Sequence, residues 1–181
     1  VRYHIDPRAQ AAKRSFKHRV LVRKTNFTFD SEIIGEWQPK IHEIYQALMT
    51  NENRTALIVS DILKAIEEKR FPIVLTERRE HLDRLFELLH PEIQNTIVMQ
   101  GGMGKRQKEH VKNLLAQIGD NEPRIILATG RYIGEGFDDH RLDTLFLTLP
   151  ISWRGTLTQY VGRLHREHSQ KDEVIINKGT Q

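Results

Sequence analysis

Two arginines and a glutamine in the last quarter of the chain have the spacing that a phosphate receptor needs. Gln159, Arg163 and Arg166 are four and three residues apart, so on an α-helix they would lie on one stripe. Each guanidinium group can form two parallel hydrogen bonds to a phosphate. A charged stripe that contacts only water would have the same appearance, so the spacing alone leaves both interpretations open.

The opposite side of the same predicted helix is apolar. Leu157, Val161 and Leu164 repeat with the same spacing, about 160° around the helix axis from the polar stripe. An apolar stripe of this kind is expected to pack on a core, which would leave the amide and the two guanidinium groups facing outward. The sequence therefore predicts a helix that is fixed on one side and presents positive charge on the other.

A second segment precedes this helix. Residues 128–138 read Ala-Thr-Gly-Arg-Tyr-Ile-Gly-Glu-Gly-Phe-Asp, and residues 159–166 read Gln-Tyr-Val-Gly-Arg-Leu-His-Arg. In this order and spacing the two segments resemble motifs V and VI of the superfamily 2 helicases and translocases, and most of all those of bacterial DEAD/DEAH-type helicases. The similarity extends over about residues 54–176 and implies the C-terminal RecA-like lobe of such a motor.

The resemblance also implies roles for individual residues. In these motors two lobes enclose ATP, and the second lobe supplies arginines that reach the γ-phosphate. By this resemblance Arg166 is the arginine finger, Arg163 is its partner on phosphate or on the first lobe, and Gln159 is a sensor of the other lobe or of the γ-phosphate.

Motif V implies a nucleotide contact as well. Asp138 resembles the family residue that accepts hydrogen bonds from ribose hydroxyls, although an Asx turn with Asp139 is the alternative. Glu135 would contact the neighbouring lobe or would be a solvated acid in a loop. The predicted nucleotide-binding residues are Asp138, Gly136, Gly134 and Glu135.

Alternating strand and helix signals predict the fold. Short apolar runs, typical of buried parallel strands, occupy residues 71–76, 96–99, 124–128, 144–149 and 173–176. Helical periodicity occupies residues 36–50, 55–69, 78–90 and 105–118. Repeated β-α units with short connections predict a mostly parallel central sheet with helices on both faces. Together with the resemblance, this implies a three-layer α/β/α RecA-like domain.

Polar residues and glycines follow several of the predicted strands. Ligands of open α/β sheets bind at the carboxyl ends of the strands, where helix N-termini attract phosphate. The resemblance places motif IV, around Thr76 and Arg78, and motif V, around Thr129, along a nucleic-acid backbone. Thr76 could also be the N-cap of the following helix. The predicted nucleic-acid-binding residues are Thr76, Arg78, Gly101, Gly102, Thr129 and Gly130.

Charge is concentrated at the beginning of the chain. Residues 1–24 hold eight basic residues and one acid, a charge of +7, so the remaining residues carry −3 of the total of +4. Such a segment can contact nucleic acid, or it can be a linker whose charges keep it in solution. We therefore divide the chain into a basic arm or linker at 1–30 and a helicase C-terminal domain at 31–181, and the weak alternation at 17–29 could add an edge strand or a hairpin.

Composition excludes several classes of protein. The chain has no cysteine, so it can form neither a disulfide nor a thiolate site. No apolar run approaches the length needed to span a bilayer, and the first residues lack the apolar core of a signal peptide, so we expect a cytoplasmic protein without a membrane partner. His165 and His168 lack further ligands at a suitable spacing, and no metal site is predicted.

The sequence also lacks the residues that bind and hydrolyse ATP in the first lobe of these motors. An Asp-Glu-x-His box is absent, and the stretch from Gly101 to Lys105 fails as a phosphate-binding P-loop because Met99 and Arg106 stand where it needs Gly and Ser or Thr. We therefore expect ATP to be the cofactor, Mg²⁺ to be bound by the first lobe, and this lobe to be inactive alone.

These observations predict the second motor lobe of an ATP-dependent helicase or translocase. Its partners would be the first lobe of the same protein and nucleic acid, with DNA favoured over RNA. The alternatives are a nucleic-acid-binding module without an ATPase role, the lobe of a restriction-type DNA translocase, and the lobe of a different α/β phosphate-binding enzyme such as a nucleotide-sugar transferase.

Overall fold

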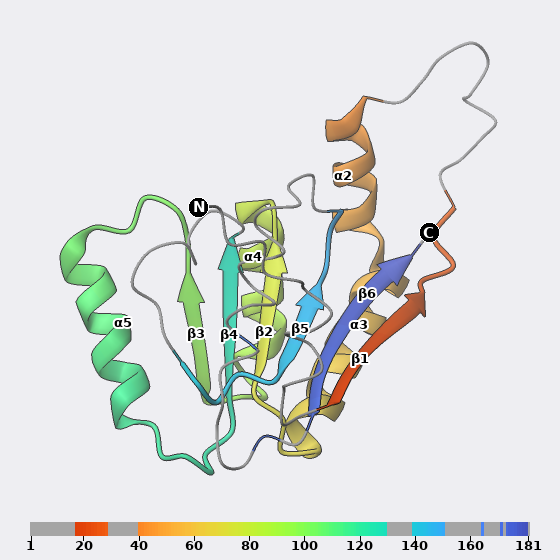
Figure 1. Cartoon of the computed structure of the whole chain (residues 1–181). Coiled ribbons are helices and arrows are strands. Elements are labelled where there is room, and N and C mark those ends of the chain that lie inside the picture. Colours follow the sequence, from red (N-terminus) through yellow and green to blue (C-terminus); the bar gives the residue numbers. More distant parts are fainter. Residues whose placement is uncertain are drawn as a thin grey trace, which may run out of the picture.

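All six strands of the described sheet run parallel (Figure 1). The computed structural model describes residues 17–28, 40–129, 139–150 and 173–180, together with Leu164 and Lys171. The strands lie in the order β1-β6-β5-β2-β4-β3. They are β1 Lys17–Lys24, β2 Pro72–Thr76, β3 Asn95–Met99, β4 Arg124–Thr129, β5 Thr144–Leu147 and β6 Glu173–Thr180. The described helices are α2 Ile41–Thr50, α3 Glu52–Glu67, α4 Arg79–Leu89 and α5 Lys105–Gln117.

The predicted α/β fold class is confirmed. The five short apolar runs correspond to β2 through β6, and the weak alternation near the beginning of the chain corresponds to the edge strand β1. Strand β5 ends at Leu147, two residues earlier than expected, and the Thr148 hydroxyl then donates a 2.8 Å hydrogen bond to the carbonyl of Leu75. Strand β6 is longer than expected because β1 pairs with it up to the register Lys24 with Thr180.

Helices α3 and α4 cover one face of the sheet. Side chains alternate along a strand, so Val74 of β2, Leu127 of β4 and Phe146 of β5 all point to this face. The helical spacing of apolar residues identified in the sequence is the reason that α4 packs here, since three and four residues return to the same side. The helices contribute Ile62, Ala65, Leu82, Leu85 and Leu89 to this layer of the core.

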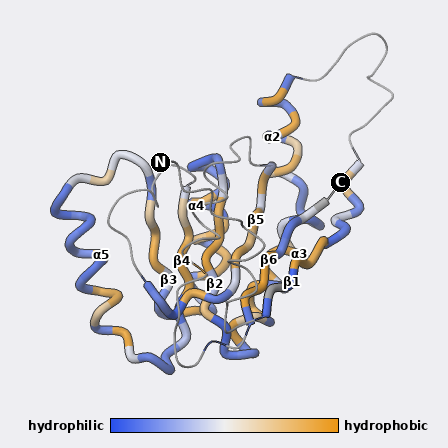
Figure 2. Tube along the Cα trace, in the orientation of Figure 1, coloured by the Kyte–Doolittle hydropathy of each residue, from blue (hydrophilic) through white to orange (hydrophobic). Residues whose placement is uncertain are grey.

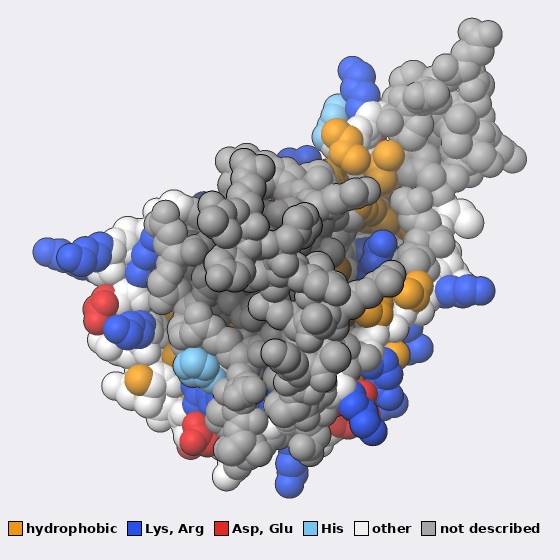
Figure 3. Space-filling view, in the orientation of Figure 1, with side chains coloured by type: hydrophobic (Ala, Val, Ile, Leu, Met, Phe, Trp, Pro, Cys, Tyr) orange, Lys and Arg blue, Asp and Glu red, His pale blue; other side chains and the backbone are white. Residues whose placement is uncertain are grey.

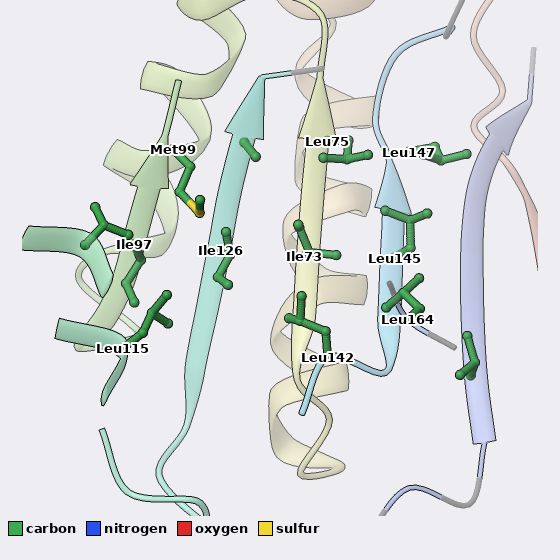
Figure 4. Close-up of a cluster of buried hydrophobic side chains, with 13 residues drawn as sticks. Ile73, Leu75, Ile97, Met99, Leu115, Ile126, Leu142, Leu145, Leu147 and Leu164 are labelled. Carbon is green, nitrogen blue, oxygen red and sulfur yellow. The ribbon is translucent and has the colours of Figure 1, made fainter. Parts of the chain in front are cut away.

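The other face of the sheet packs against α5. Ile73, Ile126 and Leu145 form the centre of this layer, and Figure 4 shows that they come from three neighbouring strands. Val111 and Leu115, four residues apart, are the buried side of α5. The rest of that helix is largely hydrophilic, whereas the central strands are apolar (Figure 2). Leu164 also belongs to this layer.

Helix α2 is held at the carboxyl edge of the sheet by a third, smaller cluster. Tyr45, Leu48 and Met49 of α2 pack there with Phe27 and Leu149.

A buried arginine joins α2 to the end of β5. The guanidinium group of Arg54, near the beginning of α3, donates to the carbonyl oxygens of Leu48 and Thr148. Because burial disfavours the charged form, the pKa of Arg54 falls to about 10, but the side chain stays cationic at neutral pH. The carbonyl groups that end α2 and β5 are therefore satisfied by one side chain.

Part of the basic N-terminal segment forms β1, which is an edge strand of the sheet. Arg19 pairs with Glu173 at 3.2 Å and Arg23 pairs with Asp61 at 2.9 Å, so two of its charges have acidic partners within the domain. Val20 and Val22 are exposed on the same strand. The remainder of the segment 1–30, apart from residues 25–28, lies outside the described residues, and the division at residue 30 stays a prediction.

Helix α4 offers a matched pair of leucines for testing this packing. Leu85 is 1% exposed and Leu88 is 44% exposed on the same helix. We expect Leu85→Ala to lower the free energy of unfolding by about 2 to 5 kcal/mol, because it removes buried contacts and leaves a cavity. Leu88→Ala should cost less than about 1 kcal/mol. Urea denaturation of both variants would measure the difference, and equal losses would contradict the placement of α4.

Candidate functional site

Two segments predicted to bind nucleic acid meet at the carboxyl edge of the sheet. The main-chain N–H of Gly101, just after β3, donates a 3.0 Å hydrogen bond to the hydroxyl of Thr129, the last residue of β4. The next residue, Gly102, has a φ of +87°, a conformation that glycine adopts at little cost. Both glycines are exposed and nothing lies within 4 Å of where their side chains would be. The loop is therefore open to a ligand while its position is fixed by Thr129.

The loop leads directly into α5, whose N-terminus is unusually basic. Gly104 is the N-cap, and its N–H donates a 2.9 Å hydrogen bond to the side chain of Gln107. The first turn contains Lys105 and Arg106 and no acid, although the partial positive charge of a helix N-terminus favours acids there. Lys and Arg side chains project over the beginning of this helix in Figure 3. Like charges gathered at one point create a potential that would attract an anion.

Thr76, the predicted motif IV residue, lies at the end of β2. Its hydroxyl is 3.0 Å from Nδ1 of His81 and 3.4 Å from the main-chain N of Arg78, and the residue is only 3% exposed. The alternative that Thr76 is the N-cap of α4 is wrong, because Arg78 occupies that position. Its role in binding a strand stays a prediction, and the bond to His81 shows that its hydroxyl already has one partner.

Arg78 is exposed and is fixed over an aromatic ring. Its guanidinium carbon lies 4.9 Å from the centre of the Tyr45 ring, which is a cation–π geometry. The Tyr45 hydroxyl donates a 2.8 Å hydrogen bond to the carbonyl of Pro150. Burial, followed by the charge of Glu77, raises the pKa of Tyr45, and Arg78 opposes this change. Arg78 therefore adds a positioned positive charge to the carboxyl edge.

His81 is buried beneath this edge. Burial, and then the positive charges of Arg54 and Arg84, lower its pKa to about 4, so the imidazole is neutral at physiological pH. Its Nε2 has no hydrogen-bond partner among the described residues. His81 could not be identified from the sequence, because a histidine inside a predicted amphipathic helix carries no signal that it will be buried.

The predicted catalytic residues lie outside the described residues. These are Gln159, Arg163 and Arg166, and the same holds for Gly130, Gly134, Glu135, Gly136 and Asp138. One residue between the arginines is described: Leu164 is helical and 1% exposed in the core layer beneath α5. This burial confirms the prediction that Leu164 packs on the core.

Charged residues are buried at the opposite, amino edge of the sheet. Asp139, which follows motif V, pairs with Arg124 at 3.3 Å and accepts a 2.8 Å hydrogen bond from Nε of Arg141. Arg141 also donates to the carbonyl oxygens of Leu115 and Ile118, which end α5, at 3.1 Å each. Burial raises the pKa of Asp139, but the hydrogen bonds and charges of the two arginines more than offset it and leave the pKa lowered.

A second buried group lies beside the first. The carboxylate of Asp143 accepts hydrogen bonds from the N–H of Phe71 at 3.0 Å and from the hydroxyl of Thr144 at 2.8 Å, and Arg70 lies 3.5 Å away. A cavity of about 500 Å³ at this edge is lined by Arg70, Arg141, Asp143 and Lys171 among others. No role was predicted for these residues from the sequence.

The described residues were also compared with what a metal site and a membrane-spanning helix require. Among the described residues, no group of three or more His, Cys, Asp or Glu could hold a metal ion. No helix within the described part of the chain combines the length and the apolar character needed to cross a membrane.

Solved structures share this fold. No family model and no curated protein matches the sequence. T4 UvsW superimposes with a TM-score of 0.66 and 16% identity over 91% of this chain, and the C-terminal part of the Fun30 ATPase domain with 0.60 and 12% over 74%. Domain 2 of the Mss116p DEAD-box helicase, solved with an RNA duplex, gives 0.55 and 14% over 91%.

These similarities establish the fold of the chain. The match covers 32%, 42% and 54% of the three chains, so this chain spans about a third to about half of their lengths. The chain has the fold of a helicase C-terminal RecA-like lobe, as motifs V and VI indicated.

The buried His81 gives the site a test by pH. Between about pH 6.5 and about pH 4 the unfolded chain binds a proton at His81 and the folded chain does not, so stability falls as the pH falls. We expect this contribution to approach about 1.4 kcal/mol per pH unit and to disappear in His81→Gln. Urea denaturation at several pH values would measure it. The exposed His110 offers a control, since His110→Gln should keep the wild-type slope, and an unchanged slope in His81→Gln would contradict the burial.

Proposed function

We propose that this chain is the second motor lobe of an ATP-dependent nucleic-acid helicase or translocase. In this proposal it supplies arginines to ATP held by a first lobe and contacts a nucleic-acid strand along its carboxyl edge. The fold shared with helicase and ATPase domains supports the general class. Motifs V and VI support the particular role, because they contain the residues that such a lobe needs.

The burial of Leu164 is the observation that carries the proposal. Leu164 lies in the core, and Arg163 and Arg166 flank it in the sequence. On a regular helix Arg163 projects about 100° and Arg166 about 160° away from Leu164. A helix with Leu164 against the sheet would therefore direct both guanidinium groups away from the core.

Outward guanidinium groups suit phosphoryl transfer. Negative charge on the γ-phosphate must be stabilised during the reaction, and a planar guanidinium can bind two of its oxygens at once. Arg166 would act on the γ-phosphate, and Arg163 and Gln159 would couple it to the first lobe. Asp138 would bind the ribose, with Gly134, Glu135 and Gly136 beside it, and the first lobe would hold Mg²⁺.

The carboxyl edge suits the backbone of a nucleic acid. Gly101 and Gly102 form an exposed loop at the basic N-terminus of α5, and the loop is fixed to Thr129. Main-chain N–H groups, a helix N-terminus and basic side chains are the groups that usually contact phosphates. Contacts to phosphate oxygens are common to DNA and RNA. Our preference for DNA, like the cytoplasmic location, remains a proposal, and the Mss116p domain was solved with RNA.

The arginines provide the first test of this function. In the complete protein we expect Arg166→Ala to reduce ATP turnover by about a thousandfold or more, because an arginine finger has an effect of that size. Arg163→Ala should also inactivate the protein. Arg→Lys should not rescue either position, since a point charge does not reproduce the planar fork.

Thermal unfolding of the same variants separates catalysis from folding. Both alanine variants should melt close to the wild type, because their side chains would leave no cavity in the core. Arg79→Ala, at an exposed arginine on α4, should keep both turnover and melting temperature. Normal turnover in Arg163→Ala and Arg166→Ala would refute the proposal.

The basic N-terminus of α5 provides a second test. We expect Lys105→Ala and Arg106→Ala each to weaken nucleic-acid binding and to reduce the slope of log affinity against log salt by about 1. Lys112→Ala is the matched control, because Lys112 is exposed about two turns further along the same helix. Titration of single-stranded DNA and RNA at several salt concentrations would measure each slope. Identical slopes in all the variants would show that α5 does not contact phosphate.

A further inference from the structure

Lys171 has a buried ammonium group that binds the main-chain carbonyl of a motif VI residue. The residue is 7% exposed, and its Nζ donates a 3.0 Å hydrogen bond to the carbonyl oxygen of Leu164. Burial lowers its pKa to about 8, while Asp143 and Asp139 oppose this change. The group therefore stays mainly protonated at neutral pH, and its charge is favoured by two carboxylates at the amino edge of the sheet.

Both the main chain and the side chain of Asp143 are fixed by hydrogen bonds. The main-chain N–H of Asp143 donates to the carbonyl of Phe71 at 3.2 Å, and the main-chain carbonyl of Asp143 accepts from the N–H of Ile175 at 2.9 Å. The side chain is bound by Phe71 and Thr144, as described above. Asp143 is therefore anchored to β5, to β6 and to the residue that precedes β2, so the negative charge that acts on Lys171 has a fixed position in the sheet.

We propose that Lys171 is a positioning residue for the arginines of motif VI. Its ammonium group binds the carbonyl oxygen of Leu164, and the anchored acids at the amino edge of the sheet act on its charge. Because Leu164 lies between Arg163 and Arg166, this contact would set where the two guanidinium groups project. The inference rests on the proposed function, since it assigns Lys171 no contact with the nucleotide.

The same contact gives motif V a link to motif VI. Asp139, which follows Asp138 directly, is held by Arg124 and Arg141 and also acts electrostatically on Lys171. The segment after motif V and a residue of the motif VI helix are thus tied to one group of buried charges. A displacement of the segment after motif V would change the electrostatic energy of the group bound to motif VI, because buried charges are weakly screened.

Steady-state kinetics of the complete protein test the positioning role. We expect Lys171→Met, which keeps the length of the side chain and removes its charge, to lower kcat for ATP at least tenfold while KM changes less than about twofold. Lys171→Arg should restore most of kcat. Lys69→Met is the matched control, because Lys69 is an exposed lysine lining the same cavity, and it should behave like the wild type. Wild-type kinetics in Lys171→Met would overturn the inference, as would a loss that Lys171→Arg does not rescue.

Hydrogen exchange separates this inference from the proposed function. Lys171→Met should speed amide exchange at residues 157–168 of the complete protein several-fold, with little change in β2 or β4, and Lys171→Arg should not. Unchanged exchange at 157–168 would overturn the role of Lys171 even if Arg166→Ala abolishes turnover. Faster exchange together with normal turnover in Arg166→Ala would instead support the contact of Lys171 and refute the proposed function.

Discussion

Parallel pairing of the strands is the constraint on which the other features of this structure depend. It sends the carboxyl end of every described strand to one edge of the sheet and every amino end to the other. It also requires both faces to be covered, because the strands are joined through helices that pack on the sheet. The loop at Gly101 and the hydroxyl of Thr129 meet for this reason: they follow adjacent parallel strands, β3 and β4.

The two edges use polar groups in opposite ways. At the carboxyl edge, Gly101, Gly102 and Arg78 are exposed, so a ligand can reach this loop and the guanidinium group of Arg78. At the amino edge, Arg124 and Asp139 are buried as an ion pair, and breaking such a pair leaves an uncompensated charge. The carboxyl edge is therefore accessible to ligands, whereas the amino edge is a fixed part of the protein interior.

Much of this arrangement could be predicted from the sequence. Short apolar runs gave the positions of β2 to β6 within a few residues, because buried parallel strands need apolar residues on both faces. Thr129 and Gly101 could be placed at one edge, but their hydrogen bond could not, since nothing in the sequence says that β3 lies next to β4. The buried charges were missed because Arg124, Asp139 and Lys171 look like surface residues until their partners are known.

The pairing of β1 with β6 joins the beginning of the described chain to its end. Lys17 aligns with Glu173, so the chain must be made as far as β6 before this ladder can close. Until then β1 has no neighbour, because β6 is the strand that separates it from β5. During synthesis on the ribosome, the exposed Val20 and Val22 would lie on an unpaired strand, which is the kind of segment that chaperones bind and that aggregates when they do not. The order of synthesis thus leaves β1 unpaired until β6, the last of the described strands, has been made.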